Sequence, residues 1–342
     1  MPVVIQKYIA KEEKELEMSK IKKMLITGGA GFIGSHLCDK YTKEGHIVLC
    51  LDNFLSGNLT NVRHLLDYRN FKLIKGDIRD FELLEKIMRD VDVVFHLAAQ
   101  IHVDRSYIEP KLTYEVNVMG TQNVLEVARM HDAKKIIYAS TSEVYGSAQY
   151  AGIDEKHPLN ASHPYGASKI AADRMCYAYI QTYGMNISIM RMFNIFGPRQ
   201  RDIGYGGVIS IFTRRILSGV PPIVYGDGQQ TRDYTYVDDA IKAYDLVFNH
   251  SEPLTEPINF GTGKKVSIID LANMLIDLCG KSKAVKPVHV EPRIGEVNTL
   301  IADASKARKL LGWKPEYDFE EGLSKFVKWY RNYGFEERLK ID

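Results

Sequence analysis

From Lys23 to about residue 195, short apolar runs alternate with longer segments of helical spacing. Segments 32–45, 80–90 and 113–131 place their apolar positions on one face of a helix. Strands that alternate with helices predict a parallel sheet covered on both faces, and therefore an α/β fold. The runs expected to form strands are KMLIT (23–27), HIVLCLD (46–52), FKLIKGD (71–77), DVVFHLA (92–98), KKIIYAS (134–140) and NISIMRM (186–192).

This regularity weakens after about residue 195, where glycine and proline become frequent. One clear amphipathic stretch follows, VSIIDLANMLIDLCG at 266–280. We predict two closely packed units, residues 23–195 and a smaller C-terminal α/β lobe at 196–342, and leave open that some later segments return to the first unit. Residues 1–22 form a highly charged N-terminal extension, unlike a signal peptide, to which we assign no function.

The composition changes this picture little. The 342 residues are 26% charged with a formal net charge of +2, and both signs are mixed along the chain, so neither a nucleic-acid nor a membrane partner is expected. No apolar run approaches the roughly 20 residues of a membrane span. The four cysteines show no CxxC spacing, which favours reduced buried thiols, a cytoplasmic location and no metal site.

A glycine-rich turn follows the first predicted strand. TGGAGFIGS (27–35) places Gly28, Gly31 and Gly34 three residues apart, between a strand and a helix. The first two allow a tight turn and close approach of the backbone to a pyrophosphate, and the third allows close packing of helix on strand. The helix N-terminus offers free N–H groups to phosphates. The segment therefore predicts a dinucleotide site.

Acidic residues follow the second and third predicted strands. Asp52 is placed to accept hydrogen bonds from a ribose diol. Its charge would repel a 2′-phosphate, and the next residues, Asn53 and Phe54, supply no arginine to offset it, so NAD is favoured over NADP. Asp77 is expected either near the adenine or as the N-cap of the helix that follows.

Tyr165 and Lys169 stand four residues apart in HPYGASK and share one face of a predicted helix. Ser162 and Pro164 suit the start of that helix. An ammonium group beside a phenol favours the phenolate, and a bound cationic nicotinamide would favour it further. A tyrosine with a lowered pKa can remove the proton of an alcohol. We therefore expect this pair to be catalytic.

These motifs together resemble the extended short-chain dehydrogenase/reductase family, in its branch of nucleotide-sugar epimerases and dehydratases. The resemblance runs from about Met24 to about Trp329. It implies a Rossmann-type doubly wound parallel sheet that holds NAD, a smaller C-terminal substrate-binding lobe, a nucleotide-sugar substrate and a homodimer. The amphipathic helical patterns at 111–131 and 165–183 suit pairing with a second copy as a four-helix bundle, and the sequence leaves a tetramer open. The matching segments are TGGAGFIGSHL, LDNF, GDIRD, FHLAAQ, NVMGTQNVLE, YGASK, RMFNIFGPRQ, YGDGQQTRDYTYVDD and GTGKKVSI.

The resemblance also implies roles for single residues. Thr141 would bind the sugar 4-hydroxyl, Tyr165 would be the base, and Lys169 would also hold the nicotinamide ribose. His96 is expected to pack beside the cofactor, and Arg191 and Asp233 to be structural. Cofactor contacts are expected at Gly28, Gly31, Phe32, Ile33, Asp52, Asn53, Asp77, Ile78, Ala98 and Lys169. Substrate contacts are expected at Ser142, Asn194, Arg201, Arg232 and Arg293.

Glu143 bears on the reaction itself. It ends the segment Thr-Ser-Glu in YASTSEVYG (138–146) and resembles the glutamate with which 4,6-dehydratases remove the C5 proton of a 4-keto sugar. The segment HVDRS (102–106) also resembles dehydratases. Those enzymes usually carry an acid where Ser142 stands. Thr-Ser-Glu is similar to the GDP-mannose dehydratases, which manage with the glutamate and water, and it also matches UDP-glucuronate decarboxylases. The segments AAQ (98–100) and 226–239 look like those of epimerases. We predict a 4,6-dehydratase, with a 4-epimerase and then a decarboxylase as alternatives.

The sequence says less about the sugar. Leu300 stands where some relatives carry a bulky aromatic residue beside the sugar's C2 group. A smaller side chain there leaves room for an N-acetyl group, so UDP-GlcNAc is the first expected substrate. UDP is expected as the commonest nucleotide in this branch.

Overall fold

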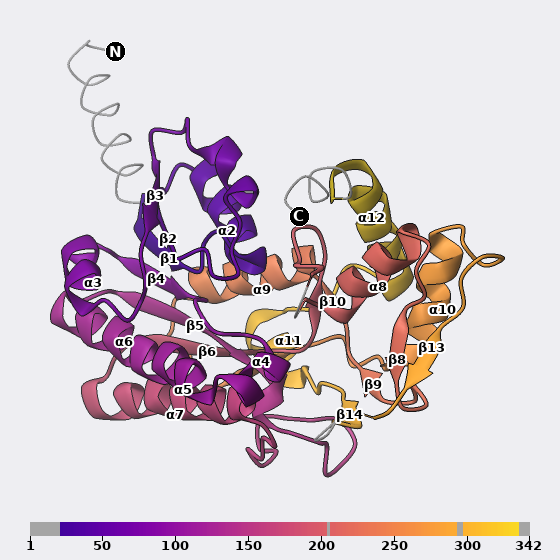
Figure 1. Cartoon of the computed structure of the whole chain (residues 1–342). Coiled ribbons are helices and arrows are strands. Elements are labelled where there is room, and N and C mark those ends of the chain that lie inside the picture. The colour runs from indigo at the N-terminus through magenta and orange to yellow at the C-terminus, as the bar shows by residue number, and fades with distance from the viewer. Residues whose placement is uncertain (1–20, 204–205, 293–296, 335–342) are drawn as a thin grey trace, which may run out of the picture.

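Seven parallel strands form the central sheet, in the order β11-β6-β5-β4-β1-β2-β3 (Figure 1). The computed structural model describes residues 21–203, 206–292 and 297–334. The six strands predicted from the sequence are all present, which confirms the Rossmann-type doubly wound α/β fold. The strands are β1 (Lys23–Thr27), β2 (Ile47–Asp52), β3 (Phe71–Lys75), β4 (Val93–His96), β5 (Lys135–Thr141), β6 (Ile187–Met192) and β11 (Ile258–Phe260).

Helices cover both faces of this sheet because its side chains alternate between two apolar cores. Met24 and Ile26 of β1 join one core with α2 and α9, whereas Leu25 joins the other core with α3, α6 and α7. Figure 1 shows α3, α6 and α7 together on one side of the strands. The helices are α2 (Phe32–Lys43), α3 (Phe81–Met88), α4 (Val103–Ile108), α5 (Pro110–Tyr114), α6 (Thr121–Met130), α7 (Pro164–Tyr183) and α9 (Val237–Asn249).

The segment expected as one helix at 113–131 is interrupted. A π-helical turn, η3 (Glu115–Gly120), separates α5 from α6. Within that turn, Asn117 accepts a hydrogen bond from the Gln100 backbone N–H (2.7 Å) and donates one to its carbonyl (2.9 Å). These bonds tie the helix to the loop after β4, which runs along the edge of the cavity described below. Single π turns inside helices frequently occur at functional sites.

The C-terminal lobe has its own apolar core, built around α8, α10 and α12. Its three small sheets pair β7 with β10, β8 with β13, and β9 with both β12 and β14. The elements are β7 (Ile195–Phe196), α8 (Val208–Leu217), β8 (Ile223–Tyr225), β9 (Thr231–Arg232), β10 (Thr235–Tyr236), β12 (Val266–Ser267), α10 (Ile268–Leu278), β13 (Val288–Val290), β14 (Thr299–Leu300), α11 (Ser305–Leu311) and α12 (Phe319–Trp329). Short helical turns lie at η1 (Leu59–Asn61), η2 (Arg63–Leu65), η4 (Ser142–Val144) and η5 (Tyr330–Gly334).

Two segments after residue 195 return to the central sheet. The strand β11 pairs with β6, and α9 packs its Ala240, Ala243 and Tyr244 into the core beneath β1 and β4. We therefore keep the division after residue 195 as a proposal in which α9 and β11 belong to the nucleotide-binding unit. Residues 1–20 of the proposed N-terminal extension lie outside the described residues.

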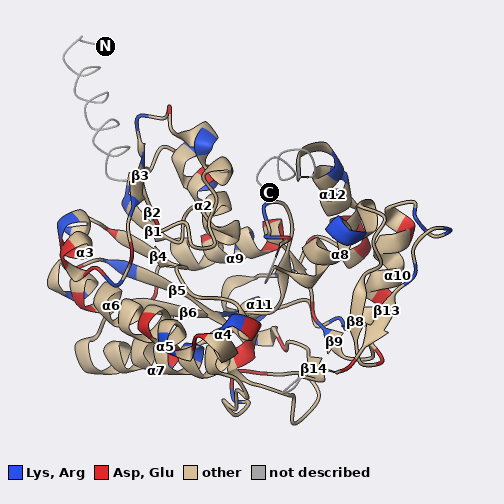
Figure 2. Ribbon diagram, in the orientation of Figure 1, with Lys and Arg blue, Asp and Glu red and all other residues tan. Residues whose placement is uncertain are grey.

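Charged residues of both signs are distributed over both lobes (Figure 2). In the described part of the chain, none of the helices has the length and apolar character needed to cross a membrane. All four cysteines are buried and free of disulfides.

Candidate active site

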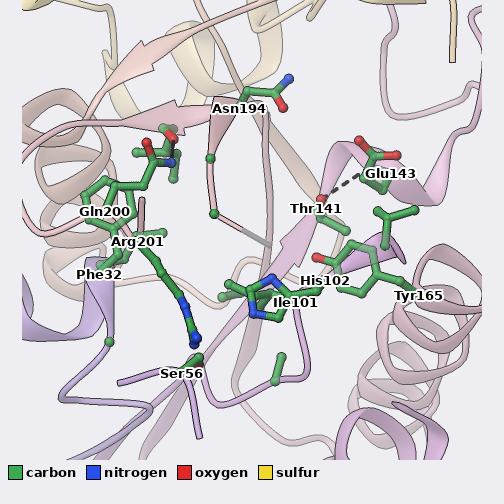
Figure 3. A pocket seen from close by; sticks show the side chains of 18 of the residues that line it. Phe32, Ser56, Ile101, His102, Thr141, Glu143, Tyr165, Asn194, Gln200 and Arg201 are labelled. Atoms are coloured by element: carbon green, nitrogen blue, oxygen red, sulfur yellow. Dashed lines mark hydrogen bonds between the residues drawn. The ribbon is translucent and has the colours of Figure 1, made fainter. Parts of the chain in front are cut away.

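A cavity of about 1060 Å³ lies at the carboxyl ends of the central strands and is lined by both lobes. Its position is the one where open α/β sheets bind ligands. Every described residue that was predicted to be catalytic or to contact the cofactor or substrate lines it, except His96 and Leu300. Arg293 lies outside the described residues. Figure 3 shows Thr141, Glu143 and Tyr165 grouped on one side of the cavity and Phe32, Gln200 and Arg201 on the other.

The glycine-rich turn is packed so closely that Gly28 and Gly34 have no room for a side chain. Gly28 has φ +70°, and a Cβ added there would lie 2.9 Å from the Ala98 nitrogen. A Cβ on Gly34 would overlap the Gly28 carbonyl oxygen and lie 2.8 Å from the Gly29 Cα. Phe32 and Ile33 begin α2 directly after the turn, so the helix N-terminus opens onto the cavity. This geometry fits a pyrophosphate against the backbone.

Asp52 ends β2 and is almost fully buried. Its carboxylate accepts hydrogen bonds from the backbone N–H groups of Ala30 (3.0 Å) and Phe54 (2.8 Å). Burial raises the pKa of Asp52, and these two hydrogen bonds oppose that shift. The bond to Ala30 fixes the carboxylate beside the glycine turn. The position suits a ribose whose pyrophosphate rests on that turn.

Asp77 follows β3 at the same end of the cavity. Its carboxylate accepts hydrogen bonds from Arg79 (3.0 and 2.9 Å) and Asn53 (2.9 Å). The hydrogen bond from Arg79 is the main cause that lowers the pKa of Asp77, to about 2. The alternative that Asp77 caps the next helix is wrong, because Asp80 is the N-cap of α3 and accepts from the Leu83 N–H (3.0 Å).

Tyr165 and Thr141 meet at the opposite end of the cavity. Burial, and next the charge of Glu143, raise the pKa of the Tyr165 phenol, whereas its hydrogen bond with Thr141 lowers it. Burial also lowers the pKa of Lys169 to about 8. Lys169 donates to the Ala139 carbonyl (2.6 Å) and lies 4.4 Å from the centre of the Tyr138 ring. The pKa of Tyr165 is thus raised in the protein itself, contrary to the expectation that Lys169 lowers it.

Glu143 lies in η4, the turn that follows β5. Its backbone N–H donates to Thr141 Oγ1 (3.3 Å), and its carboxylate Oε2 lies 3.2 Å from His163 Nε2. His163 is the N-cap of α7: its Nδ1 accepts from the Gly166 N–H at 3.0 Å, while Pro164 is the first helical residue. The helix thus begins where the sequence predicted, but the cap is His163 rather than Ser162.

The predicted substrate residues come from separate elements. Ser142 is buried in η4, and Arg201 donates to the Leu55 carbonyl (3.3 Å). Arg232 in β9 donates to the Val297 carbonyl (2.7 Å). The side-chain nitrogen of Asn194 is buried and has no hydrogen-bond partner in the described part of the chain. A buried donor that faces a cavity without a partner suggests a ligand acceptor.

Other residues singled out in the sequence have structural roles. His96 lies between Thr27 (2.8 Å) and Thr121 (3.0 Å), and burial lowers its pKa to about 3, so it is a neutral core residue. Arg191 pairs with Asp173 (2.9 Å) in the interior, and Asp233 accepts the Thr262, Gly263 and Ala302 backbone N–H groups.

The role expected for Leu300 is wrong. Its side chain is fully buried and packs with Val144, Tyr145 and Phe193, so it leaves no surface to the cavity. The sequence argument for an N-acetyl group therefore fails.

A family model described as GDP-mannose 4,6 dehydratase matches residues 25–326. The chain belongs to the extended short-chain dehydrogenase/reductase family. Within that family, it is an NAD-dependent enzyme of the nucleotide-sugar epimerase and dehydratase branch. A Methanocaldococcus jannaschii protein named "Putative UDP-glucose 4-epimerase" is 42% identical over 312 residues, which cover 90% of this chain and 98% of that protein.

Two solved members of the family have closely similar folds. The UDP-glucose 4-epimerase of Thermotoga maritima, solved with UDP-glucose, has a TM-score of 0.85 and 36% identity over 90% of this chain and 98% of its own. The dTDP-glucose 4,6-dehydratase DesIV of Streptomyces venezuelae, solved with NAD, has a TM-score of 0.86 and 34% identity over 92% of this chain and 98% of its own. Both reactions occur on this fold, so the cavity's own residues must distinguish them.

Sequence reasoning missed several residues of this family member's cavity. His163, Arg199 and Gln200 all line it. Arg199 carries φ +71° and pairs with Asp39 of α2 (2.6 Å), which ties the loop after β7 to the nucleotide-binding unit. Only His163 had a local signal in the sequence: it directly precedes Pro164, and the residue before a helix-starting proline is the N-cap position.

Proposed function

We propose that the protein is a UDP-hexose 4-epimerase. The observation that carries this proposal is Ser142, a buried hydroxyl at the position where most family dehydratases carry the acid that protonates the departing C6 hydroxyl. Serine is a far weaker acid than a carboxyl group, so elimination loses that assistance, whereas epimerisation needs no acid there. Relatives that carry the epimerase name support the same choice.

In this proposal Tyr165 removes the proton of the sugar 4-hydroxyl and later returns it. Thr141 ends β5 beside the phenol, and its hydrogen bond with Tyr165 lowers the tyrosine's pKa. NAD supplies the acceptor and donor of the C4 hydride when bound. Because burial raises the pKa of Tyr165 in the protein alone, the positive charge of the bound cofactor would favour the phenolate once the site is filled.

Asn194, Arg201 and Arg232 are the proposed contacts of the nucleoside diphosphate. The unpartnered amide donor of Asn194 and two guanidinium groups lie along one cavity. Guanidinium groups suit phosphate oxygens. UDP is proposed because a solved relative was obtained with UDP-glucose. UDP-glucose replaces UDP-GlcNAc as the first substrate to test, since Leu300 does not face the cavity.

A 4,6-dehydratase is the second candidate, and Glu143 favours it. Its carboxylate lines the cavity at the Tyr165 end, where it suits removal of the C5 proton from a 4-keto sugar. In an epimerase the same carboxylate would accept hydrogen bonds from sugar hydroxyls.

The product's mass separates these reactions. Purified protein is incubated in turn with UDP-glucose, UDP-GlcNAc and UDP-glucuronate, and each product is analysed by mass spectrometry and chromatography. We expect UDP-glucose to give a product of unchanged mass that elutes as the 4-epimer. Loss of one water would overturn the epimerase in favour of the dehydratase, in which case Glu143→Gln should abolish water loss. Loss of carbon dioxide from UDP-glucuronate alone would identify a decarboxylase.

We also propose a homodimer formed through η3, α6 and α7. These three elements pack against one another in the chain. They carry half-exposed apolar side chains at Met119, Met130 and Tyr183. Burying such side chains against a second copy would remove apolar surface from water. Light scattering should give twice the mass of one chain, and a monomeric mass would contradict the proposal. A cytoplasmic location stays a prediction.

A further inference from the structure

His163 has a fixed place and a fixed tautomer. It is buried at the N-terminus of α7, and its Nδ1 accepts a hydrogen bond from the Gly166 N–H (3.0 Å). A neutral imidazole has one nitrogen that donates and one that accepts. Because Nδ1 is used as the acceptor, the proton of the neutral ring is on Nε2.

That proton faces a carboxylate from another segment. His163 Nε2 lies 3.2 Å from Glu143 Oε2, although the two residues are 20 positions apart. The neutral ring therefore donates to Glu143, and hydrogen bonds to an ionised group are among the stronger ones. The second oxygen of the carboxylate takes no part in this contact.

Two aromatic rings flank the imidazole. Its plane is nearly parallel to that of Tyr165, at 4° and 6.0 Å between ring centres. The ring of Tyr107 in α4 lies on another side of the imidazole, with an interplanar angle of 73° and 6.5 Å between ring centres. One residue thus contacts both the proposed base and the carboxylate beside it.

We propose that His163 is a positioning residue that holds Glu143 in one orientation toward the sugar. Fixing a long, flexible side chain before substrate binds removes part of the entropic cost from the catalytic step. The inference rests on the proposed function only in that Glu143 faces the sugar. It holds whether Glu143 orients hydroxyl groups or removes the C5 proton.

His163→Asn separates this role from helix capping. Asparagine is a good N-cap whose side chain can accept from Gly166, but it is too short to reach Glu143 as well. His163→Ala loses both contacts. We expect the Asn variant to keep its melting temperature and NAD content while kcat for the nucleotide sugar falls about tenfold or more, with a smaller change in KM.

A double mutant tests whether the effect passes through Glu143. Glu143→Gln removes the charge, and adding His163→Asn to it should lower kcat little further, since residues that act as a pair are not additive. An Asn variant with wild-type kcat, or two losses that multiply, would overturn the inference and leave the proposed function intact. A wild type that converts neither UDP-glucose nor UDP-GlcNAc nor UDP-glucuronate would overturn both.

Discussion

The two ends of the cavity differ in whether backbone or side-chain atoms form their surface. At the cofactor end, the backbone of one continuous turn makes the surface for the phosphates, its glycines leave no room for a Cβ, and the carboxylates of Asp52 and Asp77 lie beside it. At the sugar end, side chains from β5, η4 and α7 make it, and each depends on the others for its orientation. The first surface is common to a whole family of nucleotide-binding proteins, whereas the second can change its chemistry through one side chain. The backbone turn therefore specifies the cofactor, and the side chains at the sugar end specify the reaction.

The largest expected effect lies at the sugar end. Tyr165→Phe removes the proposed base, so kcat should fall about 10²- to 10⁴-fold. The amount of NAD bound should not change, because the cofactor end is untouched. Activity is measured with UDP-glucose, and NAD content is measured after denaturing the protein.

Tyr244→Phe is the matched control for that variant. The Tyr244 hydroxyl is buried in α9 and has no hydrogen-bond partner in the described part of the chain. Its removal should leave kcat unchanged. Wild-type activity in Tyr165→Phe would mean that the fold binds its nucleotide without this chemistry, as a sensor would.

Gly34→Ala should have the next largest effect, at the cofactor end. The added Cβ would collide with the Gly28 carbonyl and the Gly29 Cα, both of them backbone atoms of the turn. Overpacking of this kind costs about 1–3 kcal/mol, which corresponds to a roughly 5- to 150-fold loss of NAD affinity if the strain falls on the bound turn. Isothermal titration of NAD into protein freed of nucleotide measures it.

Gly184→Ala tests the specificity of that loss. Gly184 ends α7 with φ +65°, and a Cβ there would meet nothing within 4 Å. Alanine should lower the free energy of unfolding by about 1 kcal/mol through backbone strain alone. NAD affinity should stay at the wild-type value. An equal loss of affinity in both variants would show that general destabilisation, not the turn, is responsible.

The same difference explains what the sequence could predict. Strands β1 to β6 are short and mostly apolar, and they alternate with helical segments, so their pattern is visible locally. The pairing of β11 with β6 could not be predicted, because β11 has only three residues and is separated from β6 by a long stretch of the C-terminal lobe. The glycine turn was predictable because its conformation excludes other residues.

Contacts between distant segments were not predictable at the sugar end. The proposed role of His163 depends on its contact with Glu143, which is 20 residues away, and the sequence around His163 does not indicate that contact. Leu300 was placed in the cavity wrongly because the position was taken from a resemblance to relatives, whereas its burial depends on packing against segments far away in the sequence. Single-sequence reasoning thus found which residues gather at this end but not how they face one another.

The smallest effect is expected for the side-chain pair of Asp77 and Arg79 at the cofactor end. Arg79 holds Asp77 with a pKa of about 2, well below its ordinary value. The folded protein therefore binds this proton less tightly than the unfolded chain, so the contribution to stability is present above about pH 4 and is lost as pH falls toward 2.

Arg79 is 40% exposed, so solvent screening reduces the contribution of this pair to about 0.5 kcal/mol. Arg79→Gln should lower the free energy of unfolding by that amount at pH 7 and by nothing near pH 2, as measured by denaturant titration at each pH. Arg129→Gln is a matched control, because Arg129 pairs with Glu126 (2.8 Å) on α6 and neither residue lines the cavity. If the backbone turn and Asp52 dominate cofactor binding, both variants should bind NAD like the wild type. A tenfold weaker affinity in Arg79→Gln alone would show that the cofactor end, too, depends on side chains that orient one another.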